Sequence, residues 1–223
     1  MTRIIAGSAG GRRLAVPPGR GTRPTSDRAR EGILLTLDSL GGVRGARVMD
    51  LYAGSGAVGL EALSRGADHA LLVESDPRAV RAIRTNVREL GLPGARVVAD
   101  KVERFLGRAG GDVAGRGRRG GETHTDPAGP AEQAGPAEPV GPAEPVEPYD
   151  IVFADPPYAV SDEEVTRVLE LLRDHGWLAE DAVVAFERET RGKALVWPEG
   201  YVEERVRRYG EASVWYGRAA GNP

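Results

Sequence analysis

Residues 50–59 read Asp50-Leu51-Tyr52-Ala53-Gly54-Ser55-Gly56-Ala57-Val58-Gly59, and this stretch decides the fold. An apolar strand pattern precedes it and a helical pattern follows it, so it predicts a sharp turn from a buried strand into a helix. Glycine suits such a turn because the backbone bends tightly and a ligand can approach it without a Cβ in the way. The spacing of the three glycines also fits the dinucleotide-binding fingerprint, so it predicts a nucleotide-type ligand without identifying it.

Strand and helix patterns alternate on both sides of this turn, which predicts a parallel sheet with helices on both faces. Apolar runs predict strands at 47–52, 70–74, 96–100, 149–154 and 182–186. Helices are expected at about 58–65, from Pro77 to Gly91, and after the capping-box pair Ser161 and Glu164. The runs 202–209 and 212–216 have no helix between them, so they predict a terminal antiparallel hairpin.

The segment from about 107 to 148 has a different composition from the rest of the chain. It consists of Gly, Pro, Ala, Glu and Arg with almost no large apolar residue, and Gly-Pro-Ala-Glu-Pro-Val occurs at 135–140 and again at 141–146. Such a segment cannot bury enough surface to offset the entropy of ordering it. We expect a disordered insertion in a surface loop, which the fold tolerates because the entropy of loop closure grows only slowly with length.

Composition narrows the class of protein. The 223 residues carry a net charge of −3, have no cysteine, and contain no apolar run long enough to span a bilayer or form a signal peptide. Three widely separated histidines do not suggest metal ligation. We therefore expect a cytoplasmic monomer that needs no metal and no membrane. Residues 1–47 carry nine arginines against three acids, so the N-terminus is a basic arm.

Acidic residues lie at or near the ends of three of the predicted strands, and they indicate which ligand binds there. Glu74 lies 20 residues after Gly54, where a carboxylate can accept hydrogen bonds from ribose hydroxyls. Asp50 would repel the pyrophosphate of a dinucleotide but attract the ammonium group of an amino acid. Asp100 could accept a hydrogen bond from an adenine amino group. These features favour S-adenosylmethionine over NAD as the cofactor.

Asp155-Pro156-Pro157-Tyr158 directly follows an apolar strand, so it is expected at the carboxyl edge of the sheet, where ligands of open α/β sheets bind. The exocyclic amine of a base is a poor nucleophile, because its lone pair is delocalised into the ring. The Asp155 carboxylate and the Pro156 carbonyl can hold its two N–H groups, and two prolines fix the backbone that carries them. Tyr158 offers a ring on which an extruded base can stack. The motif predicts methyl transfer to such an amine.

The chain resembles the bacterial 16S rRNA (guanine(966)-N(2))-methyltransferase family along nearly its whole length except the insertion. The motifs that carry the resemblance are residues 3–7, 11–14, 23–31, 51–56, 59–67, 155–158 and Tyr209-Gly210. The resemblance implies a Rossmann-like class I methyltransferase fold, an α/β sheet of seven mostly parallel strands with a terminal antiparallel hairpin. It also implies an N-terminal β-hairpin and helix extension over residues 1–40, a methyltransferase domain over 41–223, and assembling small-subunit ribosomal RNA as the substrate.

Together these arguments define a set of candidate site residues. We expect catalysis at Asp155, Pro156, Pro157 and Tyr158, and cofactor contacts from Asp50, Ala53, Gly54, Ser55, Gly56, Glu74, Asp100, Lys101 and Val102. The arm is expected to bind RNA phosphates through Arg12, Arg13, Arg23, Arg28 and Arg30. The alternatives left open are methyl transfer to adenine N6 of DNA or RNA, or to a protein glutamine. More remote alternatives are an NAD-dependent oxidoreductase and a non-catalytic RNA-binding module.

Overall fold

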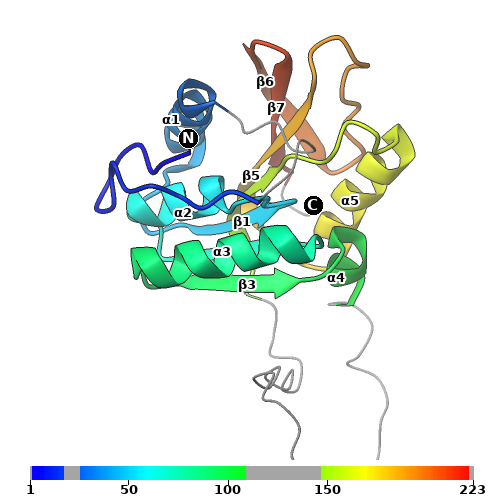
Figure 1. Ribbon diagram of the computed structural model, residues 1–223. Coiled ribbons are helices and arrows are strands. Elements are labelled where there is room, and N and C mark those ends of the chain that lie inside the picture. The colour runs from blue at the N-terminus through cyan, green and yellow to red at the C-terminus, as the bar shows by residue number, and fades with distance from the viewer. Residues whose placement is uncertain (1, 18–25, 109–146, 221–223) are drawn as a thin grey trace, which may run out of the picture.

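The computed structural model describes residues 2–17, 26–108 and 147–220, so Arg23 and most of the insertion lie outside the described residues. Five helices and seven strands make up the described chain (Figure 1). In chain order they are α1 (Asp27–Gly41), β1 (Arg47–Leu51), α2 (Ala57–Ser64), β2 (His69–Glu74), α3 (Pro77–Leu90), β3 (Ala95–Ala99), α4 (Val102–Arg108), β4 (Tyr149–Ala154), α5 (Asp162–Asp174), β5 (Leu178–Glu189), β6 (Tyr201–Tyr209) and β7 (Ala212–Ala219).

All seven strands form a single sheet in the order β3-β2-β1-β4-β5-β7-β6. The strands β1 to β5 pair in parallel, β7 runs antiparallel to β5, and β6 runs antiparallel to β7. The strand order reverses between β1 and β4, and ligands of open α/β sheets bind at the carboxyl edge of such a switch point. The predicted class I methyltransferase architecture, with its reversed terminal hairpin, is confirmed.

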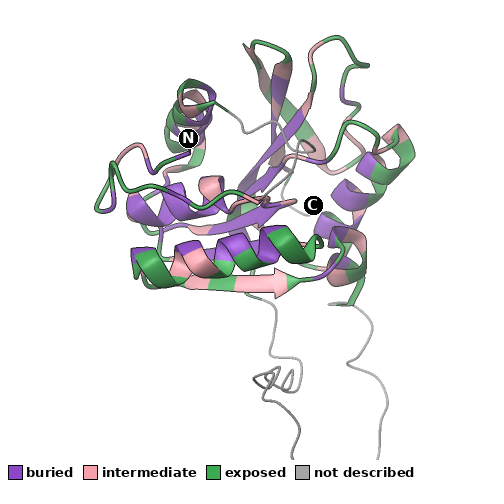
Figure 2. Ribbon diagram, in the orientation of Figure 1, coloured by how far each residue is buried: buried purple, intermediate pink, exposed green. Residues whose placement is uncertain are grey.

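Two apolar cores lie on opposite faces of the sheet, and the buried residues follow the strands and the inner faces of the helices (Figure 2). Helices α1, α2 and α3 cover one face, where Ile33, Leu60 and Ile83 are fully buried. Helices α4 and α5 cover the other face with Leu106 and Leu169. Because side chains alternate along a strand, this division fixes which residues at the strand ends project toward α1 and α2.

Local signals explain where the helices begin and end. The Asp76 side chain accepts from the Arg78 N–H at the start of α3, Pro77 occupies its first turn, and Gly91 ends it at φ 64°. At α5, Ser161 and Glu164 form the predicted capping box, each accepting from the backbone of the other. These caps satisfy N–H groups that a helix leaves without partners.

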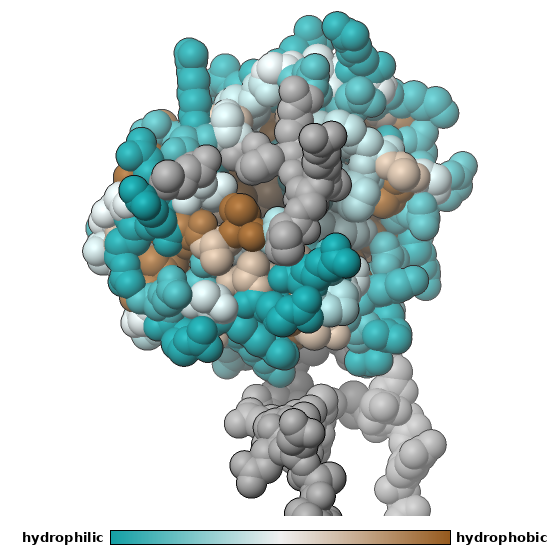
Figure 3. Space-filling view, in the orientation of Figure 1, coloured by the Kyte–Doolittle hydropathy of each residue, from teal (hydrophilic) through white to brown (hydrophobic). Residues whose placement is uncertain are grey.

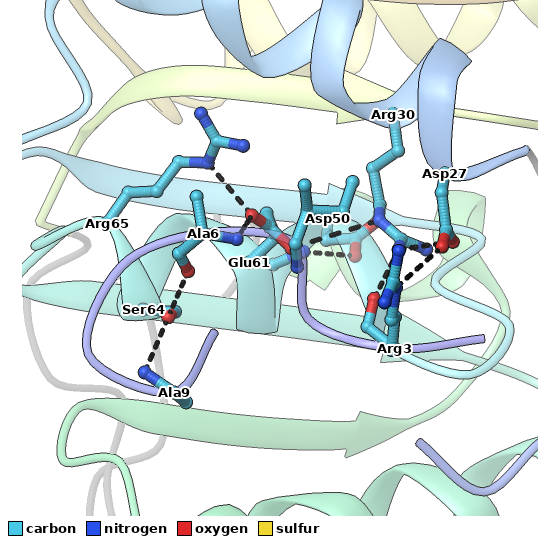
Figure 4. Close-up of polar contacts among 11 residues, drawn as sticks. Arg3, Ala6, Ala9, Asp27, Arg30, Asp50, Glu61, Ser64 and Arg65 are labelled. Carbon is cyan, nitrogen blue, oxygen red and sulfur yellow. Dashed lines mark hydrogen bonds and ion pairs between the residues drawn. The ribbon is translucent and has the colours of Figure 1, made fainter. Parts of the chain in front are cut away.

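The N-terminal segment is held against α2 by Glu61, which is 0% exposed (Figure 4). Its two carboxylate oxygens accept from the backbone N–H groups of Ile5 at 2.7 Å and Ala6 at 2.9 Å. Arg65 adds a bond of 2.9 Å. The segment itself folds back as a hairpin with one antiparallel bridge, between Arg3 and Arg13, in place of two full strands.

All the predicted strands are present, in a mostly parallel sheet with a terminal antiparallel hairpin, and they differ from the prediction at their ends. The strand β5 extends from Leu178 to Glu189, well beyond the predicted 182–186, because its later half pairs with β7. Helix α4 includes Arg108, so the first two residues assigned to the insertion belong to the fold. Within the described ranges, no helix is both long and apolar enough to cross a membrane.

Candidate active site

The glycine turn lies between β1 and α2, as predicted. Gly54 and Gly56 have φ values of 58° and 76°, in the left-handed region that favours glycine. A Cβ on Gly54 would meet no atom closer than 4.0 Å, whereas one on Gly56 would lie 2.9 Å from the Leu72 side chain. The backbone at Gly54 therefore faces open space that a ligand can use, while Gly56 allows α2 to pack closely on β2.

Glu74 lies at the end of β2 and binds the turn directly. Its Oε2 accepts from the Gly54 N–H at 2.8 Å, and its Oε1 accepts from the N–H groups of Ser75 and Asp76. A carboxylate has about four lone-pair positions, so these three bonds leave one for a ligand hydroxyl. Glu74 thus uses part of its hydrogen-bonding capacity to shape the loop, and its role in binding a ribose remains a prediction.

Asp50 is buried on β1 beneath the start of α2. Its Oδ2 accepts from the Gly59 N–H at 2.8 Å, which joins the third glycine of the turn to the strand. Burial raises the pKa of Asp50 to about 8, the Gly59 N–H opposes this, and the charges of Asp155 and Glu74 add to it. Asp50 is therefore electrostatically coupled to the carboxylates at the ends of both neighbouring strands.

Asp155 follows β4 at the carboxyl edge, beside the glycine turn. Its backbone N–H donates to the Leu51 carbonyl at 3.3 Å, which extends the pairing of β4 with β1. Burial raises the pKa of Asp155 to about 6. Pro156 is buried and Pro157 is exposed. Tyr158 is 49% exposed, so its ring remains accessible at the surface of the loop.

Glu187, on β5, is a buried acid beside the candidate site that the sequence analysis missed. The register of β4 and β5 aligns Phe153 with Ala185 and Ala154 with Phe186, so Glu187 is next to Asp155 at the sheet edge. Glu187 is 5% exposed, and its pKa is raised to about 8 by burial and by the charge of Asp155. The missed signal was an acid directly after an apolar run, the pattern that identified Asp155.

Asp100 follows β3 and is already bound by neighbouring groups. The N–H of Lys101 and the guanidinium of Arg104 donate to its Oδ1, and Arg108 binds its Oδ2 at 2.9 Å. Burial acts to raise its pKa, but the bonds and charges of these partners outweigh burial and lower it. An adenine amine at Asp100 must therefore share the carboxylate with two arginines. Val102 points into the core, 2% exposed, so only its backbone can face a cofactor.

Asn86, on α3, joins the turn to the N-terminal segment and was not anticipated either. Its Nδ2 donates to the Ser55 carbonyl at 2.9 Å and to the Ala15 carbonyl at 2.9 Å, while its Oδ1 accepts from the Ala15 N–H at 2.7 Å. Ala53, at the start of the turn, donates its N–H to the Val73 carbonyl. Through the bonds of Asn86, the basic arm is fastened beside the glycine turn.

The predicted RNA-binding arginines divide into three groups. Arg13 and Arg28 are exposed. Arg12 is also exposed, but its guanidinium donates to the Leu90 carbonyl at 2.8 Å and to the Glu89 carbonyl at the end of α3. The prediction for Arg30 is wrong. This side chain is 1% exposed and binds Asp27 and the Arg3 carbonyl (Figure 4), so it joins the arm to α1.

The visible surface combines hydrophilic and hydrophobic residues. On the face shown in Figure 3, hydrophobic residues gather near the middle of the visible surface and hydrophilic residues surround them. Tyr158 and Val16 are among the large hydrophobic side chains that remain about half exposed, at 49% each. The described residues therefore combine charged groups with isolated exposed rings and aliphatic side chains.

Comparison with known proteins identifies the family. A family described as Conserved hypothetical protein 95 matches residues 2–113 and 140–218. The ribosomal RNA small subunit methyltransferase D of Escherichia coli is 34% identical over 187 residues, which cover 84% of this chain and 74% of that protein. A Bacillus subtilis protein, YlbH, provisionally described as an rRNA methyltransferase, is 30% identical over 84% of this chain and 82% of its own length.

Solved structures agree with the sequence relatives. A structure of yhhF from Escherichia coli, provisionally described as a methyltransferase, has a TM-score of 0.74 and 29% identity, and the match covers 99% of each chain. The coverage extends over the sheet, the terminal hairpin and the N-terminal arm. The motifs, the fold and these relatives agree, and the chain belongs to the family that contains ribosomal RNA small subunit methyltransferase D.

Proposed function

We propose that this protein transfers a methyl group from S-adenosylmethionine to the N2 amine of a guanine in 16S ribosomal RNA, with guanine 966 as the target, during assembly of the small subunit. The observation that carries the proposal is a continuous series of carboxylates at the carboxyl edge, from Glu74 through Asp50 to Asp155. The names of the relatives support ribosomal RNA as the substrate, and the Asp155-Pro156-Pro157-Tyr158 motif supports an exocyclic amine.

The charges at this edge fit the proposed cofactor. S-adenosylmethionine supplies an electrophilic methyl group on a positively charged sulfur, and it also carries an ammonium group. Glu74 binds the Gly54 N–H and Asp50 binds the Gly59 N–H of the same turn, and the charge of Glu74 raises the pKa of Asp50. A cation in this position relieves the repulsion between the carboxylates, whereas the pyrophosphate of NAD increases it. This difference argues against the oxidoreductase alternative.

The residues after β4 suit the task of holding an amine. The Asp155 carboxylate and the Pro156 carbonyl are hydrogen-bond acceptors on adjacent residues, and the prolines limit how far the backbone can move. Two acceptors that take both N–H groups turn the nitrogen lone pair toward the methyl donor. Tyr158 offers its exposed ring for stacking of the extruded base. Rate enhancement then comes mainly from positioning and from electrostatic stabilisation.

The exposed arginines of the arm provide a surface for RNA. Arg13 and Arg28 can bind phosphates, and Arg12 can do so with the donors that α3 does not use. Asn86 fastens this arm beside the glycine turn, so RNA held by the arm lies near the proposed cofactor. Arg23 belongs to the same proposal, although it lies outside the described residues.

The substrate is tested by supplying labelled S-adenosylmethionine with small-subunit ribosomal RNA, partly assembled small-subunit particles, DNA or protein extract. We expect label in RNA or particles, and mass mapping should place it as N2-methylguanine at one position. Label in adenine of DNA or in protein glutamine would support one of the alternative substrates. Binding of cofactor and RNA without any methyl transfer would support a non-catalytic RNA-binding module.

The role of the motif is tested at Asp155. Asp155→Ala removes an acceptor of the amine, so methyl transfer should fall by about a thousandfold or more, in the range seen when a transition-state contact is lost. Affinity for S-adenosylhomocysteine should change by less than about threefold, a small free energy. Asp174→Ala removes an exposed carboxylate on α5 and serves as the matched control. Retained turnover in Asp155→Ala would show that another group holds the amine.

A further inference from the structure

Two acidic residues, Asp155 and Glu187, follow neighbouring strands at the carboxyl edge between β4 and β5. The parallel register of β4 and β5 ends at Ala154 and Phe186, and Asp155 and Glu187 are the next residues along these neighbouring strands, whose backbones lie about 5 Å apart. Phe153 and Ala185 belong to the core covered by α1, α2 and α3. Side chains two residues apart share a face, so both carboxyl groups project toward that core.

Glu187 is buried without the partners that buried acids require. It is 5% exposed, and its Oε2 is buried with no hydrogen-bond partner among the described residues. An isolated buried carboxylate is costly in free energy, and the group takes up a proton when no cation compensates its charge. The charge of Asp155 adds to this effect. Nothing in the architecture of the sheet requires an acid at this position, since β5 pairs with β7 through its backbone.

The other ionisable groups near this edge lie on every element that packs around it. Helix α1 runs antiparallel to β5. Gly41, at the end of α1, faces Val183 in the first half of β5, and Gly32 faces Tyr209 of β6, which lies beside the end of β5 through Ala212. The groups concerned are Asp27, Arg28, Arg30 and Glu31 in the first turns of α1, Asp50 on β1, Glu61 on α2, Glu74 on β2, Tyr209 on β6, and Tyr216 on β7. Arg30 and Glu61 are bound within the arm. Burial and Asp155 are the causes that raise the pKa of Glu187.

We propose that Asp155 and Glu187 share one proton, and that Glu187 is a positioning residue which keeps a single negative charge, that of Asp155, facing the target amine. The inference rests on the proposed function, because it assigns Glu187 a part in holding the same amine. Two neighbouring buried carboxyl groups do not both ionise readily, and a shared proton relieves their repulsion. The neutral Glu187 then donates to Asp155 and fixes its orientation.

The pair also balances the protons of the reaction. The amine nitrogen forms a bond to the methyl carbon, and the carbon–sulfur bond breaks with its electron pair going to sulfur. The nitrogen then carries a positive charge and loses one proton. Asp155 accepts this proton, and the pair becomes neutral with two protons. Release of one proton to water, as product leaves, returns the pair to its starting state.

The pair is tested first in the ligand-free protein, by carbon NMR of labelled Glu and Asp carboxyl groups over pH 5 to 10. The Glu187 signal is assigned by its loss in Glu187→Gln. We expect its titration midpoint near pH 8, with a second inflection near pH 6 from Asp155. In Asp155→Asn the inflection should vanish and the midpoint should fall by about one pH unit, because a neighbouring charge is removed. An unchanged Glu187 midpoint in Asp155→Asn overturns the proposal.

The second test is the pH profile of single-turnover methyl transfer to small-subunit RNA. If the one-proton pair is the active form, activity should rise through about pH 6 and decline through about pH 8. Glu187→Gln keeps a neutral donor at all pH values, so it should retain activity within about threefold at pH 7 and lose the alkaline decline. Glu187→Ala should lose about tenfold, with S-adenosylhomocysteine affinity unchanged within about twofold.

Glu189→Gln is the matched control, because Glu189 is an exposed acid two residues further along the same face of β5. It should reproduce the wild-type profile. If Glu187→Gln also reproduces that profile while the wild type methylates RNA, the inference fails and the proposed function stands. If the wild type methylates no RNA but the coupled titration is found, the proposed function fails and the proton-sharing pair stands.

Discussion

Two groups of buried carboxylates in this protein contrast sharply, Glu61 under the N-terminal arm and the acids at the carboxyl edge. Glu61 is 0% exposed and receives bonds from two backbone N–H groups and from Arg65, with Arg30 beside it (Figure 4). At the carboxyl edge, Asp50 accepts from one backbone N–H group, and Glu187 has an oxygen with no partner among the described residues.

This difference separates a carboxylate whose charge is compensated within the chain from carboxylates whose charge is not. A buried charge is tolerated when hydrogen bonds and opposite charges replace the water that it lost. Glu61 has those replacements within the chain. The edge acids have raised pKa values because burial is not compensated there. Strongly perturbed acids at the edge of a sheet are typical of functional sites.

The largest effect that tests this contrast is expected at Glu61. Glu61→Gln removes the charge and turns an amide N–H toward a backbone donor, so Arg30, Arg65 and the arm lose their partner. Breaking a buried ion pair on one side typically costs about 3–5 kcal/mol, and we expect a loss of that size in the free energy of unfolding. Urea denaturation measures it, with the exposed Glu180→Gln as control. A loss below about 1 kcal/mol would contradict a structural role.

The next effect concerns Asp50 and the cofactor. Asp50→Asn keeps the size of the side chain and an acceptor for the Gly59 N–H but removes the charge. Because we propose that Asp50 attracts the ammonium group, the affinity for S-adenosylmethionine should fall by about 10- to 100-fold, or about 1.4–2.8 kcal/mol. Calorimetry with S-adenosylhomocysteine, which keeps the ammonium but has a neutral sulfur, sharpens the test. Weakening confined to S-adenosylmethionine would assign the attraction to the sulfonium.

Much of the fold was predictable because its signals are local. The turn at 50–59, the caps at Asp76 and Ser161, and the glycine after α3 each depend on a few adjacent residues. The parallel sheet with its antiparallel terminal hairpin followed from the alternation of strands with helices and from the family resemblance. The end of β5 was not predictable in this way, because its last residues become a strand only by pairing with β7.

A site residue could be predicted where its residue type has one usual role. It could not be predicted where the side chain can bind any of several partners. A surface arginine and a buried one look alike in sequence, and Arg30 was misassigned because its partners Asp27 and Glu61 come together only in the folded chain. Arg104 and Arg108 reach Asp100 through the turn of α4, which no motif marks. The binding roles of these residues remain predictions.

A smaller effect is expected from Glu187 on stability. The pKa of Glu187 in the folded protein is raised to about 8, whereas in the unfolded chain it is about 4.3. The protonated acid therefore contributes stability that is fully present below about pH 4 and is lost as pH rises to about 8. Glu187→Gln cannot ionise, so the excess of its free energy of unfolding over that of the wild type should grow steadily as pH rises from 5 to 8 and level off above the folded-state pKa.

Thermal melting of the wild type, Glu187→Gln and Glu189→Gln across pH 5 to 9 provides the measurement. Asp50 and Asp155 remain in all three proteins, so their own pH dependence is common to them. A wild type that stays as stable as Glu187→Gln at pH 8.5 would mean that the buried Glu187 carboxylate is compensated by a group within the chain. The edge would then resemble the surroundings of Glu61.

The smallest effect is expected from two adjacent arginines, Arg12 and Arg13. They differ in the same way, since Arg12 is bound within the chain and Arg13 is exposed. Arg12 donates to the last carbonyls of α3, where a positive charge also interacts favourably with the helix dipole. Arg12→Ala should therefore lower the free energy of unfolding by about 0.5–1 kcal/mol. Arg13 is exposed, so Arg13→Ala should leave stability unchanged and reduce the salt dependence of RNA binding by about one phosphate contact.

Binding of RNA by each variant across a salt series, together with thermal melting, separates the two roles. Because its donors are shared with α3, Arg12 should contribute less to RNA binding than Arg13 does. The opposite result, a larger loss of RNA affinity in Arg12→Ala with no change in stability, would mean that Arg12 leaves α3 when RNA binds. The bonds of Arg12 to Glu89 and Leu90 would then belong to the RNA-free protein only, and the arm would be a surface that rearranges on binding.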